Sequence, residues 1–216
     1  MKNRDKIIFF VISIILSCLV LCYFLTGYYS IDTERIYFQG YTDYAIKDAY
    51  IRDGRWISAL IFFIVGIFNP TLKTMYIINI ILAIIILSAS VVQLYDIIKR
   101  YKKNLNNKSK FIIFIISYAY IFNFFMSNIL QYIDSFVISA SILLFILAIK
   151  KTIIEKKLKL GFILTLMGVI CYQGTIPVYI ATAILITILE NKKIDKQFFK
   201  TILPSAIFII ISSVIS

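Results

Sequence analysis

Five of the chain's eleven acidic residues lie in one polar stretch, Gly27–Trp56, and their carboxylates are the side chains best suited to chemistry. They are Asp32, Glu34, Asp43, Asp48 and Asp53. A carboxylate can act as a general base toward a hydroxyl group, or bind a divalent cation through its oxygens. The same stretch holds four cations, Arg35, Lys47, Arg52 and Arg55. Because nearly everything else is an apolar run or a basic connector, we expect the function to involve this stretch.

Two of these acids form an Asp-x-Glu pair, Asp32 and Glu34. In an extended segment alternate residues point to the same side, so both carboxylates could face one ion or one substrate. We expect them to serve as catalytic base or as ligands of a divalent cation such as Mg²⁺ or Mn²⁺. A solvated pair on a surface loop is the alternative. Asp43 and Asp48 lie on a further expected element, an amphipathic helix over Thr42–Asp53.

The arginines of the stretch are candidates for phosphate binding, because a guanidinium presents paired N–H donors to anionic oxygens. Arg55 leads directly into the apolar run Ile57–Phe68, which places it at the depth of lipid headgroups. Arg52 and Arg35 are further candidates. The alternative is that these cations neutralise the acids of the same stretch or contact headgroups.

Two other polar clusters interrupt the apolar runs. Gln131 and Asp134 flank Tyr132, and Tyr172-Gln173-Gly174-Thr175 forms a second cluster. An ionisable residue near the hydrocarbon, such as Asp134, is a site candidate by default. For Gln173 simple turn chemistry is the alternative. We expect both clusters to open on the same side as the acidic stretch, into one shared cavity.

Several kinds of site are excluded or not indicated. The chain has no histidine, which excludes histidine-dependent catalysis and histidine metal sites. Cys18, Cys22 and Cys171 lie in apolar segments, and we expect them to be buried small hydrophobes. Neither G-x-x-x-x-G-K-[ST] nor G-x-G-x-x-G occurs, so a nucleotide-sugar site is not indicated. An activated donor would then be lipid-borne.

The elements that must position these residues are membrane helices, because 61% of the residues are hydrophobic. Lysine and arginine gather in segments 1–6, 99–110, 150–159 and 192–200, which carry three, six, five and four of the 23. The positive-inside rule places these segments and the N-terminus in the cytoplasm. The net charge of +12 is explained by these loops, and no nucleic acid is expected as a partner.

The apolar runs predict an all-α, polytopic membrane helix bundle in contact with the lipid bilayer. About six true spans are expected, with turns near 127–129 and 173–175. They are Ile7–Thr26, Tyr76–Ile98, Phe111–Met126, Leu130–Ile149, Leu160–Tyr172 and Ile176–Leu189. A further run, Thr201–Ser216, starts outward again, so we expect the chain to be truncated at its C-terminus.

The run Ile57–Phe68 is expected not to span, since its twelve residues make about 18 Å of helix. It ends at Asn69-Pro70, a helix stop. A crossing there would also put the 99–110 segment outside. We therefore expect a non-spanning outer helix, an outer region over 27–75, and one transmembrane domain over 1–216.

Two short motifs carry a resemblance to a known family. The element G-R-W-I-S, Gly54–Ser58, is the more specific, and Tyr172-Gln173 is the second. With the early acidic stretch and the Pro-interrupted short helix, the chain resembles bacterial serotype-converting membrane glucosyltransferases of type II. These enzymes belong to the GT-C class of polytopic glycosyltransferases, and the chain looks like an N-terminal portion of such a fold.

The resemblance implies a function at the outer face of the bacterial plasma membrane. Such enzymes move a sugar, typically glucose, from a polyprenyl phosphate to a cell-envelope glycan. An acidic residue of the first outer loop then acts as base or metal ligand, a role that falls on Asp32 or Glu34, with Asp43 and Asp48 as alternatives. Arg55 would lie near the donor phosphate, and Gln173 near the sugar or acceptor.

Other functions remain open at this point. A polysaccharide polymerase or ligase of the same envelope pathway would share the topology but needs cations in several outer loops. A lipid-linked sugar flippase expects charges within spans and internal pseudo-symmetry. An inactive fragment is the last alternative.

Overall fold

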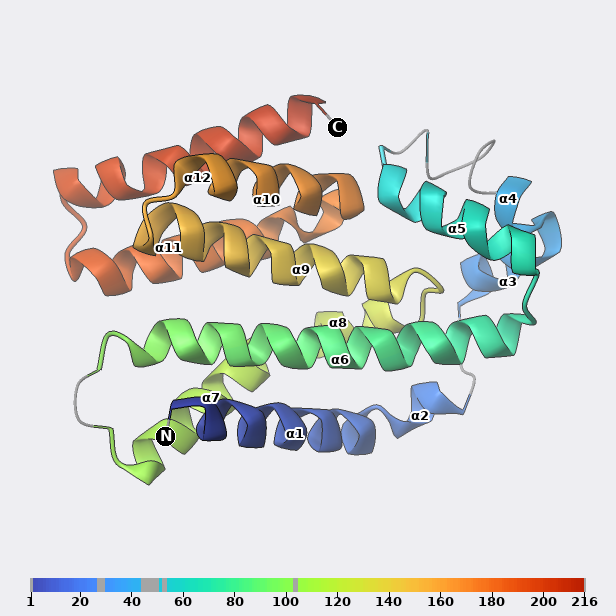
Figure 1. The fold of residues 1–216 in the computed structure, drawn as a ribbon, viewed down its shortest axis with the longest axis horizontal. Helices are drawn as coiled ribbons and strands as arrows, with labels where there is room; N and C mark the ends of the chain where they lie inside the picture. Colours follow the sequence, from blue (N-terminus) through green and yellow to red (C-terminus); the bar gives the residue numbers. More distant parts are fainter. Residues whose placement is uncertain (1, 27–29, 44–50, 52–53, 103–104, 216) are drawn as a thin grey trace.

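The computed structural model describes residues 2–26, 30–43, 51, 54–102 and 105–215, and over these the chain is helical with no strand. Most of the helices lie alongside one another in a bundle (Figure 1). Their bounds are α1 Lys2–Val20, α2 Cys22–Leu25, α3 Ile31–Gln39, α4 Tyr41–Asp43, α5 Trp56–Phe68, α6 Leu72–Lys99, α7 Asn107–Ile121, α8 Phe124–Leu130, α9 Ser135–Ile149, α10 Leu158–Cys171, α11 Ile176–Asn191 and α12 Lys196–Ile215. A π-helical turn, η2 (Lys150–Ile154), extends α9, and a 3₁₀ turn, η3 (Gln173–Thr175), joins α10 to α11.

Four helical segments within the described residues are long and apolar enough to cross a membrane. They are Leu72–Lys99, Ser135–Ile154, Gln173–Asn191 and Lys196–Ile215. Leu158–Cys171 and Trp56–Phe68 are apolar but shorter. The all-helical class is therefore confirmed over the described residues, and four long apolar helices suit a membrane protein, while the expected number of about six spans stays a prediction.

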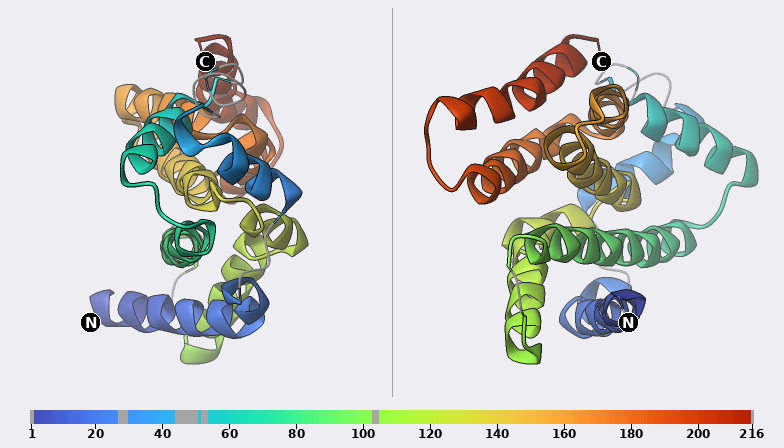
Figure 2. Two further views of the ribbon diagram at one scale, coloured as in Figure 1. Left: turned by 90° about the vertical axis from the view of Figure 1, so that its right-hand side faces the viewer. Right: turned by 60° about the vertical axis from the view of Figure 1, so that its left-hand side comes forward.

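The core lies where α6 packs on α9, with α1, α7 and α10 around this pair. Large side chains such as Tyr76, Leu87 and Phe145 are fully buried there. The outward faces of α1, α5 and α12 are instead rich in exposed large apolar side chains. Figure 2 shows that α1 and α7 are inclined to α6 rather than parallel to it. Such outward apolar surface suits helices whose solvent is lipid.

All four basic segments share one end of the bundle, on the left of Figure 1, which we call the basic end. Ion pairs join the helices there. Asp5 Oδ2 lies 3.0 Å from Lys110 Nζ and 3.6 Å from Lys99 Nζ, and Asp96 pairs with Lys6 at 2.9 Å and with Lys150 at 3.8 Å. This arrangement is the one that the positive-inside rule requires.

Helix α5 lies at the other end, which we call the opposite end, together with α2, α3 and α4 (Figure 1). It ends at Asn69, whose φ of 42° is left-handed, directly before Pro70. The expected stop at Asn69-Pro70 is confirmed. Gly66 of α5 faces the Thr42 side chain so closely that a Cβ would clash, and α4 packs against α5 there.

Some expected elements differ from those observed. The turn near 127–129 was wrong, because α8 occupies Phe124–Leu130. The break falls instead at Phe122–Asn123, where Asn123 Oδ1 accepts a hydrogen bond from the Met126 amide and begins the new helix. The chain then turns over residues 131–134.

The expected extended segment around Asp32 and Glu34 was also wrong. Ser30 caps α3 by accepting a hydrogen bond from the Thr33 amide, so both acids lie on a helix. Of the expected helix Thr42–Asp53 the structure describes only the start, because residues 44–50 and 52–53 lie outside the described residues.

The cysteines are also less uniform than expected. Cys171 is buried, but Cys18 is half-buried and Cys22 is exposed. Cys18 packs at the edge of the core, and Cys22 lies on the short helix α2.

Candidate functional site

Arg55 is held in place by the start of α5. Gly54, with a φ of 71°, makes the left-handed bend before the helix, and Arg55 takes the N-cap position. Its guanidinium then reaches two elements that are distant in sequence. Nη1 lies 3.6 Å from Asp134 Oδ2, and Cζ lies 4.6 Å from the centre of the Tyr172 ring.

Asp134 sits behind Arg55, at the N-cap position of α9, and its side chain is only 6% exposed. Burial raises the pKa of the Asp134 carboxyl above its usual range, and the charge of Arg55 opposes that shift. Among the described residues Oδ2 is a buried oxygen without a hydrogen-bond partner. The two side chains are therefore held by charge at a distance too long for a hydrogen bond.

Two further buried oxygens lie on the same elements. The hydroxyls of Ser58, one turn after Arg55, and of Ser135, next to Asp134, also have no hydrogen-bond partner within the described part of the chain. Buried polar atoms are nearly always paired, so each such atom needs an explanation. Three of the eight such atoms among the described residues, those of Ser58, Asp134 and Ser135, thus lie on the two elements that flank Arg55.

The guanidinium and the Tyr172 ring form one wall of a small pocket of about 300 Å³. Its lining residues are Arg55, Tyr172, Gln173 and Gly174. An arginine that lies over an aromatic ring gains about 0.5–2 kcal/mol from the cation–π contact. A pocket that offers a cation and the amide of Gln173 is suited to an anionic, hydrogen-bonding ligand.

A comparison with known families identifies the group of proteins to which this site belongs. The sequence profile described as Glucosyl transferase GtrII matches residues 21–216. The chain belongs to the GtrII glucosyltransferase family. The match includes every residue named above at the pocket. No curated protein and no solved structure gave a significant match.

The GtrII site gathers residues that the sequence analysis named separately. Arg55, Tyr172 and Gln173 line one pocket, and Asp134 pairs with Arg55. Residues of both polar clusters thus contact Arg55, but neither Gln131 nor Asp134 lines the pocket, and the expected shared cavity stays a prediction. The roles of these residues in the GtrII chain stay predictions.

The acids of the first polar stretch lie on neighbouring elements. Glu34 on α3 and Asp43 on α4 are both exposed. The Asp32 side chain, Asp48 and Arg52 lie outside the described residues. Helix α3 is nonetheless tied to the turn that carries Asp134: the Ser30 amide and the Thr33 hydroxyl donate to the Gln131 carbonyl at 3.1 and 3.2 Å.

The helical form of α3 affects the expected cation site. Positions two apart on a helix lie about 200° apart around its axis, so Asp32 and Glu34 do not share a face. Among the described residues no group of three or more acids or cysteines could hold a metal ion. The divalent cation stays a prediction, and it would need a ligand from a second element.

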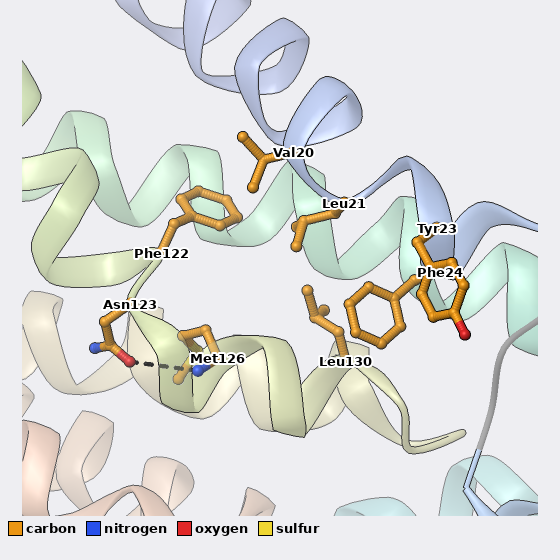
Figure 3. A pocket seen from close by; sticks show the side chains of 8 residues that line it. All are labelled: Val20, Leu21, Tyr23, Phe24, Phe122, Asn123, Met126 and Leu130. Atoms are coloured by element: carbon orange, nitrogen blue, oxygen red, sulfur yellow. Dashed lines mark hydrogen bonds between the residues drawn. The ribbon is translucent and has the colours of Figure 1, made fainter.

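A second, apolar pocket of about 390 Å³ lies between α1–α2 and α7–α8 (Figure 3). The side chains around it are Val20, Leu21, Tyr23, Phe24, Phe122, Asn123, Met126 and Leu130. This pocket could not be predicted from the sequence, because it forms at the helix break of Phe122–Asn123, which no motif marks. Its lining suits a hydrocarbon chain.

Proposed function

We propose that this GtrII-family chain transfers glucose from a polyprenyl-phosphate donor to a cell-envelope glycan at the outer face of the bacterial plasma membrane. The observation that carries the proposal is the stack of Arg55 on Tyr172 in a polar pocket at the opposite end of the bundle. The basic end would then face the cytoplasm, and the pocket the outside.

A lipid-borne donor fits this position better than a soluble one. Arg55 starts α5, a short apolar helix that lies beside the ends of the long helices, so its charge sits near headgroup depth. A phosphate at that depth can be attached to a hydrocarbon chain that stays in the bilayer. The chain also lacks the glycine-rich loops that bind nucleotide phosphates.

The proposed reaction is a displacement at the anomeric carbon. A hydroxyl oxygen of the acceptor glycan forms the new bond to that carbon, while the bond to the phosphate oxygen breaks. The hydroxyl proton passes to a carboxylate, for which Asp32 and Glu34 are the first candidates and Asp43 and Asp48 the alternatives. The leaving lipid phosphate gains negative charge, and Arg55 stabilises it, with Arg52 as a second candidate contact.

Other residues of the pocket have supporting roles in this proposal. Asp134 orients the Arg55 guanidinium from behind by charge, and Gln173 offers its amide to sugar or acceptor hydroxyls. The hydrogen bonds of Ser30 and Thr33 to the Gln131 carbonyl hold the start of α3 close in space to the turn that carries Asp134. We propose further that the chain forms the N-terminal portion of a GT-C-type fold.

The donor can be tested with membranes that contain the protein and a glycan acceptor. Radiolabelled glucose is supplied as polyprenyl phosphoglucose in one arm and as a nucleotide sugar in the other. We expect label in the glycan only from the lipid donor, and loss of that transfer in Arg55→Ala. Transfer from the nucleotide sugar, in membranes without polyprenyl phosphate, would overturn the proposed donor.

The catalytic base is tested separately with Asp32→Asn and Glu34→Gln. We expect at least one of them to abolish transfer while the protein remains folded and abundant. If both keep wild-type transfer, the assignment to these residues is wrong, and Asp43→Asn and Asp48→Asn are the variants that test the alternatives.

A further inference from the structure

We infer that Ser141 and Thr175 are positioning residues of the pocket, whose hydroxyls fix the turn that presents the Tyr172 ring to Arg55. Neither residue lines the pocket, and both are buried behind it, with exposed fractions of 0% and 1%. The inference rests on the proposed function only where it treats the pocket as the site of the donor phosphate.

The turn begins where α10 stops. Tyr172 leaves the helix in an extended conformation, with φ of −162° and ψ of 113°. The last carbonyls of a helix have no amide partner within it, and an unpaired carbonyl in a low-dielectric environment is costly. The Tyr172 amide donates to the Gly168 carbonyl at 3.1 Å, and Ser141 of α9 adds a second contact there: its Oγ lies 2.8 Å from the Gly168 carbonyl oxygen and 3.3 Å from that of Tyr172.

The Thr175 hydroxyl also donates to the Tyr172 carbonyl. Its Oγ1 lies 2.8 Å from the Tyr172 carbonyl oxygen and 2.6 Å from Ser141 Oγ. The two hydroxyl protons therefore belong to one connected network. A connected network of buried hydroxyls fixes geometry more firmly than separate bonds do. Because carbonyl and ring belong to the same residue, fixing the Tyr172 backbone sets the direction in which its ring leaves the chain.

Glycine makes this geometry possible at two positions. A Cβ at Gly168 would clash with the Phe145 ring, so only glycine lets α10 come close enough for Ser141 to reach its carbonyl. A Cβ at Gly174 would clash with the edge of the Tyr172 ring. The ring is thus confined at its edge by Gly174 and at its face by Arg55.

Other buried hydroxyls of α9 have a different environment. Ser139 donates to the Ser135 carbonyl of its own helix at 2.7 Å and is 1% exposed. This hydrogen bond stays within α9 and does not join α9 to another helix. Ser139 therefore offers a matched control, because Ser139→Ala removes the same atom as Ser141→Ala, from the same helix and at the same burial.

The first measurement needs no ligand. Hydrogen–deuterium exchange is followed in peptides that cover residues 168–176 of the whole protein in detergent, since amide protection reports local opening. We expect Ser141→Ala and Thr175→Val to speed exchange at the 172–175 turn about tenfold. Thr175→Ser keeps the hydroxyl and is expected to match the wild type, as is Ser139→Ala. Unchanged exchange in both Ser141→Ala and Thr175→Val would overturn the inference.

The second measurement uses the donor. Trp56 follows Arg55 directly and is the chain's only tryptophan, so its fluorescence can report binding of polyprenyl phosphate in micelles. We expect Thr175→Val and Ser141→Ala to raise Kd, and the donor KM, about tenfold, with kcat changed less than twofold. Faster exchange without weaker binding would overturn the positioning role.

The two proposals fail in different ways. If the wild type binds no polyprenyl phosphate and transfers no glucose from it, the proposed donor is wrong, and the exchange measurement still decides whether the two hydroxyls fix the turn. If the wild type binds but Thr175→Ser is as weak as Thr175→Val, the hydroxyl is not what positions the ring.

Discussion

The Arg55 guanidinium lies 4.6 Å from the centre of the Tyr172 ring, although the two residues come from the start of α5 and the end of α10. The contact joins the short helix α5 to the central bundle. Because both residues line the same pocket, the contact holds the guanidinium where the proposed donor phosphate would bind. The distance between these residues is therefore the geometric basis of several predictions.

Loss of the guanidinium should weaken the use of the donor. We expect Arg55→Ala to lower kcat/KM for polyprenyl phosphoglucose roughly 10- to 100-fold, since a hydrogen bond to a charged group contributes about 1.5–3 kcal/mol. Arg55→Lys should recover little, because an ammonium cannot stack or donate in pairs. Lys73→Ala removes an exposed cation from the same end of the bundle and serves as control. Equal losses in both variants would indicate a general charge effect.

The Tyr172 ring, rather than its hydroxyl, should matter for donor binding. We expect Tyr172→Phe to bind polyprenyl phosphate nearly as the wild type does. Tyr172→Leu should raise Kd roughly 2- to 30-fold, the range of a lost cation–π contact of about 0.5–2 kcal/mol. Titration of Trp56 fluorescence measures both. A Phe variant as weak as the Leu variant would contradict this assignment.

Asp134 should make stability depend on pH in a defined direction. Its folded-state pKa is raised above the ordinary value of about 3.8, so the fold favours the protonated form. That contribution is complete below about pH 3.8 and is lost as the pH rises through the folded-state pKa. The wild type should therefore lose stability as the pH rises, whereas Asp134→Asn should not. We expect the Tm of Asp134→Asn minus that of the wild type to increase from pH 4 to pH 8.

Melting curves in detergent at several pH values test this prediction. Glu34→Gln, which removes an exposed carboxylate from the same end, controls for general electrostatics. A Tm difference between Asp134→Asn and the wild type that does not change with pH would show that the carboxyl is not shifted upward by burial.

The membrane orientation gives a fourth prediction. Green fluorescent protein fused after Asn106, Lys156 or Lys193 should be fluorescent, because these positions belong to the basic segments that the positive-inside rule assigns to the cytoplasm. Alkaline phosphatase should be active when fused after Pro70, Tyr132 or Gly174. If α5 spans the bilayer instead, the fusion after Pro70 becomes inactive and the assignment of α5 fails.

Much of the fold could be predicted because its determinants are local. Twelve apolar residues before Asn69-Pro70 predict a short helix with a stop, and Asn69 is indeed left-handed. Charge alone predicts that the basic segments share one end. The turn at Gln173–Thr175 follows from its glycine and its position between two apolar runs.

The remaining features depend on contacts that a sequence pattern does not contain. The helix break at Asn123 rests on one side-chain cap, and the helical form of the Asp32–Glu34 segment rests on Ser30, which the alternation argument ignored. The pairing of Arg55 with Asp134 needs the close approach of α5 to the turn before α9. Polarity predicted that these residues are candidates, but only the packing of helices shows that they meet.

The gathering of lysines and arginines at the basic end has an electrical consequence. A bacterial plasma membrane carries an inside-negative voltage, and each unit charge moved across it changes the energy by about 2.3 kcal/mol per 100 mV. Because the four basic segments carry 18 of the 23 cations, the voltage would oppose inversion of the bundle in the proposed orientation. Asp5 and Asp96 offset only a few of these charges. The orientation should therefore tolerate neutralisation of any one basic loop in an energised cell.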